Sequence, residues 1–354
     1  MSEGVENIGL PIAAAAGGRN RLTAGRLAWT IALLIGVLIL ISLVAIAVGS
    51  EHVSLVSIWR ICWAALTGRS ASVPGYQVSI IADVRLPRIL TAVVVGAALS
   101  VAGAAYQGLL KNPLADPYIL GVSTGAAVGA IVATVFAESI LVGRPIAAFA
   151  GAILTMAAVY GLGQKERGSS SDRLILAGII TNTFLSSVVI FLLTASSGSQ
   201  LRSIFSWLIG DLSGTTSLLP LVVAIVVAGI AVVFLNARSL NLLMIGDQDA
   251  QALGVEVRRV RLIMFAAASL ITGAVVAISG VIGFVGLVVP HAVRMVCGSD
   301  NRIVIPASGL VGASFLLLAD LIARTILSPR EIHIGVITAL IGAPVFVYLL
   351  RRSA

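Results

Sequence analysis

Long stretches without a charged residue dominate this sequence, and short polar segments separate them. Nine such runs occur, at 27–48, 89–110, 117–137, 145–163, 174–201, 212–237, 262–293, 303–319 and 332–350. A helix needs about 20 apolar residues to cross a bilayer. Most of these runs therefore predict one membrane-spanning helix each.

The seventh run is too long for a single span. It covers 262–293, which is 32 residues. As one helix it would measure about 48 Å, whereas the hydrocarbon core of a bilayer is about 30 Å thick. Glycines at 280, 283 and 286 and a proline at 290 lie in its second half. We expect a break near Gly280–Gly283, which gives ten transmembrane helices per subunit.

The basic residues between the runs support this division. With ten helices and an inward N-terminus, 15 basic residues fall in inner segments and 8 in outer ones. An unbroken seventh helix would change the distribution to 13 and 10. Cytoplasmic loops carry an excess of Lys and Arg, so we predict that both termini face inward.

Composition agrees with a polytopic all-α membrane protein. Hydrophobic residues make up 58% of the 354 positions and charged residues 11%, against about 25% charged in soluble proteins. The formal charge of +8 comes from short loops, so it does not indicate a nucleic-acid partner. Two distant cysteines predict neither a metal site nor a disulfide framework. We divide the chain into a cytoplasmic segment, 1–26, and one transmembrane domain, 27–352.

Few residues offer chemistry of their own. The two lysines, Lys111 and Lys165, do not follow a phosphate-binding glycine loop, so this chain has no such route to ATP hydrolysis. An ion-driven carrier would need functional carboxylates in mid-membrane, and a membrane enzyme would need a cluster of His, Asp or Glu; the sequence shows neither. Asp320 precedes Arg324 by four residues, a spacing that predicts a local ion pair.

Two polar segments invite a functional interpretation. In Gly246–Gly254, Asp247 suits a helix N-cap and Gly254 the position after a helix end, so we expect a short cytoplasmic helix there and a second through Val255–Val260. This segment is either a loop helix on the membrane surface or a docking element for a cytoplasmic partner. The outer Arg85–Arg88 stretch supplies either interface anchors or docking points for acidic groups.

The chain resembles the FecCD-type permeases of ABC importers, which serve iron siderophores, haem and vitamin B12. The resemblance covers about residues 30–352. It rests on Arg-Leu-Pro-Arg at 85–88, Asn-Pro-Leu-Ala-Asp-Pro at 112–117, the glycine-rich segment 280–291, Leu-Ala-Asp-Leu-Ile-Ala-Arg at 318–324 and Thr-Ala-Leu-Ile-Gly-Ala-Pro at 338–344. It implies ten helices, a homodimer in the bacterial inner membrane, two cytoplasmic ATPase subunits that bind ATP and magnesium, and an extracytoplasmic binding protein.

The resemblance also implies site residues. Those that press on the ATPases would be Gly246, Asp247, Asp249, Ala252, Leu253 and Gly254. Arginines that meet the binding protein would be Arg85, Arg88 and Arg324. The path and its cytoplasmic gate would include Asn112, Leu114, Ser171, Asp172, Thr181 and Asn182. His333 stands where the family often has proline; it either touches the cargo or is a solvated loop residue. No catalytic residue, metal site or cofactor is expected in this chain.

Overall fold

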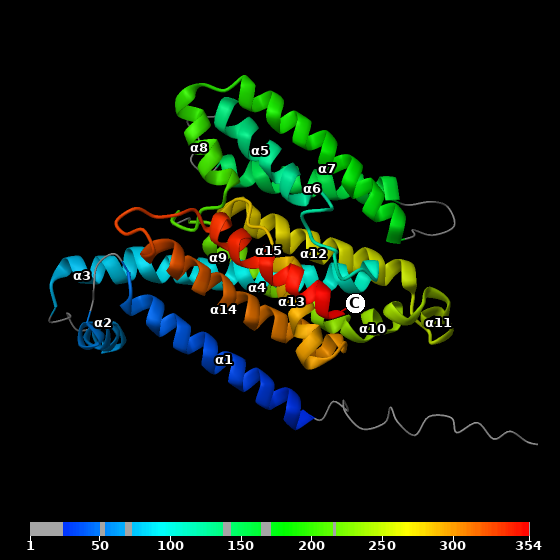
Figure 1. The fold of residues 1–354 in the computed structure, drawn as a ribbon, viewed down its shortest axis with the longest axis horizontal. Coiled ribbons are helices and arrows are strands. Elements are labelled where there is room, and N and C mark those ends of the chain that lie inside the picture. Colours follow the sequence, from blue (N-terminus) through cyan, green and yellow to red (C-terminus); the bar gives the residue numbers. More distant parts are fainter. Residues whose placement is uncertain are drawn as a thin grey trace, which may run out of the picture.

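A computed structural model describes residues 24–49, 54–67, 73–136, 143–163, 171–214 and 217–353, and this part of the chain is helical throughout (Figure 1). Most of the predicted segment 1–26 therefore lies outside the described residues. The elements in chain order are α1 (Ala24–Ala47), α2 (Leu55–Thr67), α3 (Gly75–Ser79), a π-helical turn η1 (Ile80–Arg85), α4 (Leu86–Leu110), α5 (Val122–Phe136), α6 (Gly143–Gly163), α7 (Ser171–Thr194), α8 (Gly198–Leu208), α9 (Leu219–Leu235), α10 (Ala237–Ile245), α11 (Asp247–Ala252), α12 (Val257–Ser279), α13 (Val285–Cys297), α14 (Asn301–Thr325) and α15 (Ile334–Ser353).

Each of the ten predicted segments contains a helix, but fewer of them are long enough to span alone. Seven helices in the described residues are long and apolar enough, and the pair α9 and α10, bent by 51°, would make an eighth. The apolar helices α5 and α13 have only 15 and 13 residues. The all-α membrane architecture is thus supported, whereas ten spans, their orientation and a dimer stay predictions.

The predicted break in the longest run is present. The first helix, α12, ends at Ser279 and α13 begins at Val285. Gly280 has a φ of +66°, and a Cβ atom at this position would lie 2.1 Å from the Trp207 carbonyl oxygen. Only glycine meets both demands, the left-handed conformation and the close approach of another backbone.

Small residues let the helices around α4 approach closely. A Cβ atom on Gly103 of α4 would lie 1.9 Å from the carbonyl oxygen of Gly286 in α13, and one on Gly96 would lie 2.3 Å from that of Gly312 in α14. Such contacts replace the hydrophobic effect as a source of association in lipid. Accordingly, 78% of an apolar 18-residue stretch in the long helix that contains α4 is buried, whereas the corresponding share for the peripheral helix α1 is 6%.

One predicted helix was wrong in extent, and one predicted polar insert contains helices. The run 174–201, expected as one helix, ends at Thr194 and restarts as α8. The interruption lies at Ser196-Ser197-Gly198. Here the Ser197 N–H donates to Gln200 Oε1 at 3.0 Å, a contact that starts a new helix. The outer polar insert 49–88 also holds α2, α3 and η1, which were not predicted.

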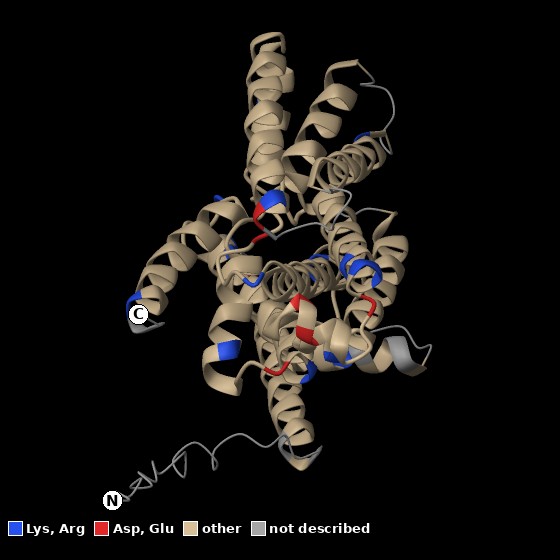
Figure 2. Cartoon of the chain, turned by 90° about the vertical axis from the view of Figure 1, so that its right-hand side faces the viewer, with Lys and Arg blue, Asp and Glu red and all other residues tan. Residues whose placement is uncertain are grey.

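The bundle has two distinct ends. In Figure 1 the end of α1, α3, α8 and the start of α15 lie on the left, whereas α10, α11 and the C-terminus lie on the right. Figure 2 looks onto the second end, where basic and acidic residues are both displayed. By the predicted topology this charged end faces the cytoplasm, and the left-hand end is the outer one.

Candidate translocation cavity and coupling surface

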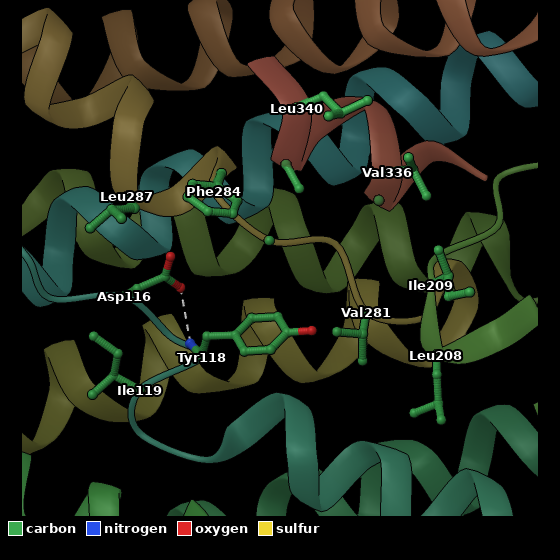
Figure 3. A pocket seen from close by; sticks show the side chains of 13 residues that line it. Asp116, Tyr118, Ile119, Leu208, Ile209, Val281, Phe284, Leu287, Val336 and Leu340 are labelled. Carbon is green, nitrogen blue, oxygen red and sulfur yellow. Dashed lines mark hydrogen bonds between the residues drawn. The ribbon is translucent and has the colours of Figure 1, made fainter. Parts of the chain in front are cut away.

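One candidate site is a cavity of about 660 Å³ beside the break between α12 and α13 (Figure 3). It is lined by Asp116, Tyr118, Ile119, Leu208, Ile209, Val281, Gly283, Phe284, Leu287, Gly335, Val336, Ala339 and Leu340. These residues come from the α4–α5 connection, the end of α8, the helix break, and the starts of α13 and α15. The break therefore supplies part of the cavity wall, through Val281, Gly283 and Phe284.

The cavity wall is mainly apolar, with polar groups contributed by one connection. Asp116 is the single carboxylate among the lining residues. It is 8% exposed and accepts a hydrogen bond from the Tyr118 backbone N–H at 2.9 Å, drawn as the dashed line in Figure 3. A wall of this kind can accommodate a bulky, weakly polar molecule without binding it tightly.

The three arginines predicted to dock a partner come together at the predicted outer end, but they are buried. Arg85, Arg88 and Arg324 are 4%, 8% and 6% exposed. Arg88 donates to Asp320 at 2.9 Å and to Glu331 at 2.7 Å. Arg324 Nε lies 3.0 Å from Asp320, which confirms the expected local pair.

Arg85 makes contacts of a different kind. Its Nη1 atom donates to the Ile46 carbonyl oxygen at 2.5 Å, which ties η1 to the end of α1. All three guanidinium groups thus have partners within the chain. Another protein's carboxylate could reach them only if these contacts opened, so docking by these arginines stays a prediction.

The predicted coupling segment lies at the opposite end and is exposed. It contains the short helix α11. Ala252, the last residue of α11, and Leu253, which follows it, are exposed, and Leu253 is 64% exposed. Gly254 has a φ of +83°. The Gly254 N–H donates to the Gln251 carbonyl at 2.9 Å and the Val255 N–H to the Ala250 carbonyl at 2.9 Å. This is the Schellman arrangement, so the predicted helix end at Gly254 is confirmed.

Two details of that segment differ from expectation. The N-cap of α11 is Gly246 rather than Asp247, which instead lies in the first turn together with Asp249. The expected second short helix at Val255–Val260 does not form, because Val257 already begins the spanning helix α12. The separate short helix next to α11 is instead α10, on its N-terminal side.

Asp247 does not cap α11 but connects it to neighbouring helices through ion pairs. Its carboxylate accepts from Lys111 at 3.1 Å and from Arg261 at 2.7 Å, so it joins the end of α4 to α12. Partial burial opposes the charged form, but these two cations outweigh it and lower the pKa of Asp247. These two ion pairs therefore hold α11 against the end of α4 and against α12.

The predicted gate residues do not line the large cavity. Asn112 and Leu114 lie in the α4–α5 connection, where the Asn112 side chain accepts from the Leu114 N–H at 2.9 Å. On α7, Asp172 is exposed and Thr181 is half-buried. Asn182 accepts a hydrogen bond from Thr124, which places it between α7 and α5. The side chain of Ser171 lies outside the described residues.

The profile of the FecCD transport family matches residues 35–352, nearly the whole chain. The chain belongs to the FecCD transport family.

His333, which stands where the family often has proline, is exposed in the loop before α15.

Several curated FecCD relatives are similar over most of their length. An uncharacterized ABC transporter permease protein, YvrB of Bacillus subtilis, is 43% identical over 88% of this chain and 90% of its own. The cobalamin import system permease BtuC of Halobacterium salinarum is 44% identical over 82% and 79%. The hemin transport system permease HmuU of Yersinia pestis is 39% identical over 89% and 94%.

A solved structure agrees with the fold. An inward-facing conformation of a metal-chelate type ABC transporter superposes with a TM-score of 0.81 at 32% identity, covering 92% of this chain and 99% of that one. The fold of this chain is therefore shared with an ABC transport protein.

Sequence reasoning missed the cavity wall itself. Asp116 and the 280–287 segment lie within motifs that carry the family resemblance, but the motifs do not reveal that they converge. Apolar lining residues of α8 and α15, among them Leu208 and Leu340, also fall in such motifs, but an apolar residue in apolar surroundings does not reveal that it lines a cavity. Their role depends on the packing of segments that are far apart in sequence.

Proposed function

We propose that this chain is the membrane-spanning permease subunit of an ABC importer that moves a bulky metal chelate across the bacterial inner membrane. The observation that carries the proposal is the cavity of about 660 Å³ at the helix break, combined with an exposed short helix at the opposite, charged end. Membership in the FecCD family supports both interpretations.

The working unit would contain two copies of this chain. The cavity is open rather than enclosed. The helix α15 lines it, and only 22% of an apolar 18-residue stretch of α15 is buried. A second copy facing α15 would enclose a path between the two subunits. Two ATPase subunits would bind beneath, against the coupling surface formed by α10 and α11, and a binding protein would deliver the cargo at the outer end.

Transport would proceed by alternating access. ATP binding would close the two ATPases, and α11 would pass that motion to α4 and α12 through the contacts of Asp247 with Lys111 and Arg261. The two subunits would then rock and open the path on one side at a time. Because the lining is mainly apolar, the cargo would meet few groups that could retain it.

The cargo we favour is a ferric siderophore, followed by haem and then cobalamin. Relatives named for cobalamin, hemin and siderophore transport are about equally similar, at 44%, 39% and 39% identity. All three kinds of cargo are metal chelates too large for a narrow pore. This common feature supports a metal chelate as the class of cargo. Uptake measurements must then distinguish among siderophore, haem and cobalamin.

A reconstituted system tests the proposal. The chain would be expressed with the ATPase and binding protein encoded beside its gene, placed in liposomes, and offered a ferric siderophore, haem or cobalamin. We expect accumulation of one cargo that requires both ATP and the binding protein. Accumulation that ignores ATP and follows a proton or sodium gradient would contradict it and favour a secondary carrier.

A further inference from the structure

A second cavity, of about 350 Å³, lies against α8 at the outer end of the bundle. It is lined by Arg144, Ser199, Arg202, Ser203, Ser206, Trp207, Asp211, Gly214 and Ile278. Six of these nine side chains are charged or carry a hydroxyl, in contrast to the mainly apolar wall of the larger cavity. The mechanism proposed above makes no use of it.

The polar wall is built by one face of a short amphipathic helix. Ser199, Arg202, Ser203 and Ser206 follow the i, i+3, i+4, i+7 spacing and so share a face of α8. Ile204, on the other side of the helix, is 2% exposed and anchors it to the bundle. The helix therefore displays three hydroxyl groups and one guanidinium group in a fixed array.

The cavity also carries unbalanced positive charge. Arg144, from the first turn of α6, faces the array and donates to the Ser203 hydroxyl at 3.2 Å. Within the described ranges, no carboxylate oxygen lies within 4.0 Å of a guanidinium nitrogen of Arg144 or Arg202. The Asp211 carboxylate shares the cavity, but it accepts from the Ser213 N–H at 2.8 Å and the Ser213 hydroxyl at 2.5 Å.

We propose that this cavity binds a carboxylate group of the transported solute. Guanidinium groups pair with carboxylates through parallel N–H donors, and the serine hydroxyls supply further donors around them. A cavity of 350 Å³ lies at the small end of ligand sites, so it suits a small polycarboxylate or one anionic arm of a larger molecule.

The position of α8 favours the solute as the source of that carboxylate. Trp207 lines the polar cavity, whereas the next two residues, Leu208 and Ile209, line the larger apolar one. The last turn of one helix thus borders both cavities. A chelate with an anionic arm would contact the polar cavity before its apolar body entered the larger one. This role in transport rests on the proposed function, but carboxylate binding does not.

Binding can be measured on the full chain alone, without the ATPase or a binding protein. Citrate would be titrated into the purified permease in nanodiscs at low ionic strength, by calorimetry. We expect saturable binding that weakens with added salt, and a loss of about tenfold in affinity for each of Arg144→Gln and Arg202→Gln. Arg60→Gln is the matched control, since Arg60 is an exposed arginine of α2 at the same end.

A second pair of variants separates geometry from charge. Arg144→Lys with Arg202→Lys keeps both charges but loses the forked donors, and Ser203→Ala removes the hydroxyl that Arg144 contacts. We expect intermediate affinities from both. Melting temperatures equal to that of the parent protein would show that the fold is intact. Equal citrate affinity in the parent protein and the Arg144→Gln, Arg202→Gln double variant would overturn the site.

The transport role has its own readout in the reconstituted system. We expect the double glutamine variant to lose uptake of a ferric chelate that carries free carboxylates, with uptake of a neutral ferric hydroxamate unchanged. If the variant instead weakens association with the binding protein and leaves citrate binding unchanged, the solute assignment is overturned in favour of protein docking. Absence of any uptake by the parent protein, with citrate binding intact, would refute the proposed function and not this site.

Discussion

Asp320 is the residue on which the buried arginine cluster depends. Its side chain is fully buried between Arg88 and Arg324, at 2.9 and 3.0 Å. Removing one member of a buried ion pair leaves an uncompensated charge and costs about 3–5 kcal/mol. We therefore expect Asp320→Ala to lower the unfolding free energy by about that amount, measured by denaturant titration of the purified permease.

Glu331 provides the comparison for this prediction. It pairs with the same Arg88, at 2.7 Å, but its side chain is 48% exposed. Exposed pairs contribute about 0–1 kcal/mol, so Glu331→Gln should leave the unfolding free energy nearly unchanged. Equal losses in the two variants would mean that the cluster is solvated and that burial does not determine its strength.

Asp300 should make stability depend on acidity. It caps α14 by accepting from the Arg302 N–H at 2.9 Å and also accepts from the Asn241 amide at 2.8 Å. Desolvation by burial opposes its charge, but the hydrogen bonds and charge of Arg302 and the hydrogen bond from Asn241 together outweigh it and lower the pKa of Asp300 from 3.8 to about 2. A lowered pKa in the folded state stabilises the protein above pH 3.8, and this contribution disappears as the pH falls to about 2.

Comparison with Asp300→Asn isolates that contribution. The amide keeps an oxygen that can cap the helix but cannot be protonated in this range. The melting temperature of the parent protein should exceed that of the variant by a constant margin above pH 4, and the margin should shrink between about pH 4 and pH 2. A margin that does not change with pH would contradict the assignment.

Among the helices, the contact between α4 and α13 is sensitive to the size of the residue at position 103. A methyl group on Gly103 would lie 1.9 Å from the Gly286 carbonyl oxygen, so the helices must separate to admit it. Overpacking of this kind costs about 1–3 kcal/mol or more. We expect Gly103→Ala to lower the melting temperature and the yield of folded protein.

Gly36 is the matched control for that substitution. It also lies in the middle of an apolar helix, α1, but a Cβ atom there would meet nothing within 4 Å. Gly36→Ala should therefore be neutral or slightly stabilising, since alanine favours a helix by up to about 1 kcal/mol. Comparable damage from both variants would show that glycine matters for backbone flexibility instead of close packing.

Sequence predicted the apolar elements better than the polar ones, for a physical reason. A run of 20 apolar residues has few alternatives to a membrane helix, and Gly280 reveals a break because glycine alone fits that backbone. Short amphipathic helices such as α2 and α8 consist of residues that also suit loops, so periodicity does not separate them. The burial of Arg88 could not be predicted from the sequence, because its partners, Asp320 and Glu331, are more than 230 positions away along the chain.

The helix α11 supplies a prediction about assembly. Leu253 is an apolar side chain with 64% exposure on the proposed coupling surface. If it enters the ATPase, Leu253→Ser should reduce co-purification of the ATPase severalfold without changing the melting temperature of the permease. Val296→Ser is the control, since Val296 is 80% exposed at the end of α13. Unchanged co-purification in Leu253→Ser would exclude this residue from the interface.

At the scale of the whole molecule, the question is which apolar flank faces a second copy and which faces lipid. Among the candidate spans in the described residues, the three least buried are α1, α7 and α15, with 6%, 17% and 22% of an apolar 18-residue stretch buried. They do not share one surface, because α1 and α7 lie on opposite sides of the bundle in Figure 1. Of the three, α15 lines the large cavity, through Leu340 among others.

A cavity open to lipid would fill with acyl chains and could not conduct a chelate, so we expect the second copy to cover α15. Leu340 is 67% exposed, and Leu40 on α1 is similarly exposed at 62%. With Cys62 and Cys297 replaced by alanine, a bifunctional thiol reagent should link two copies through Leu340→Cys and not through Leu40→Cys. Linking through Leu40→Cys alone would move the interface to α1, and a single-copy mass for the assembled importer would remove the dimer altogether. Only the first result leaves the cavity as one half of a shared path, which makes the position of α15 the point on which the transport proposal depends.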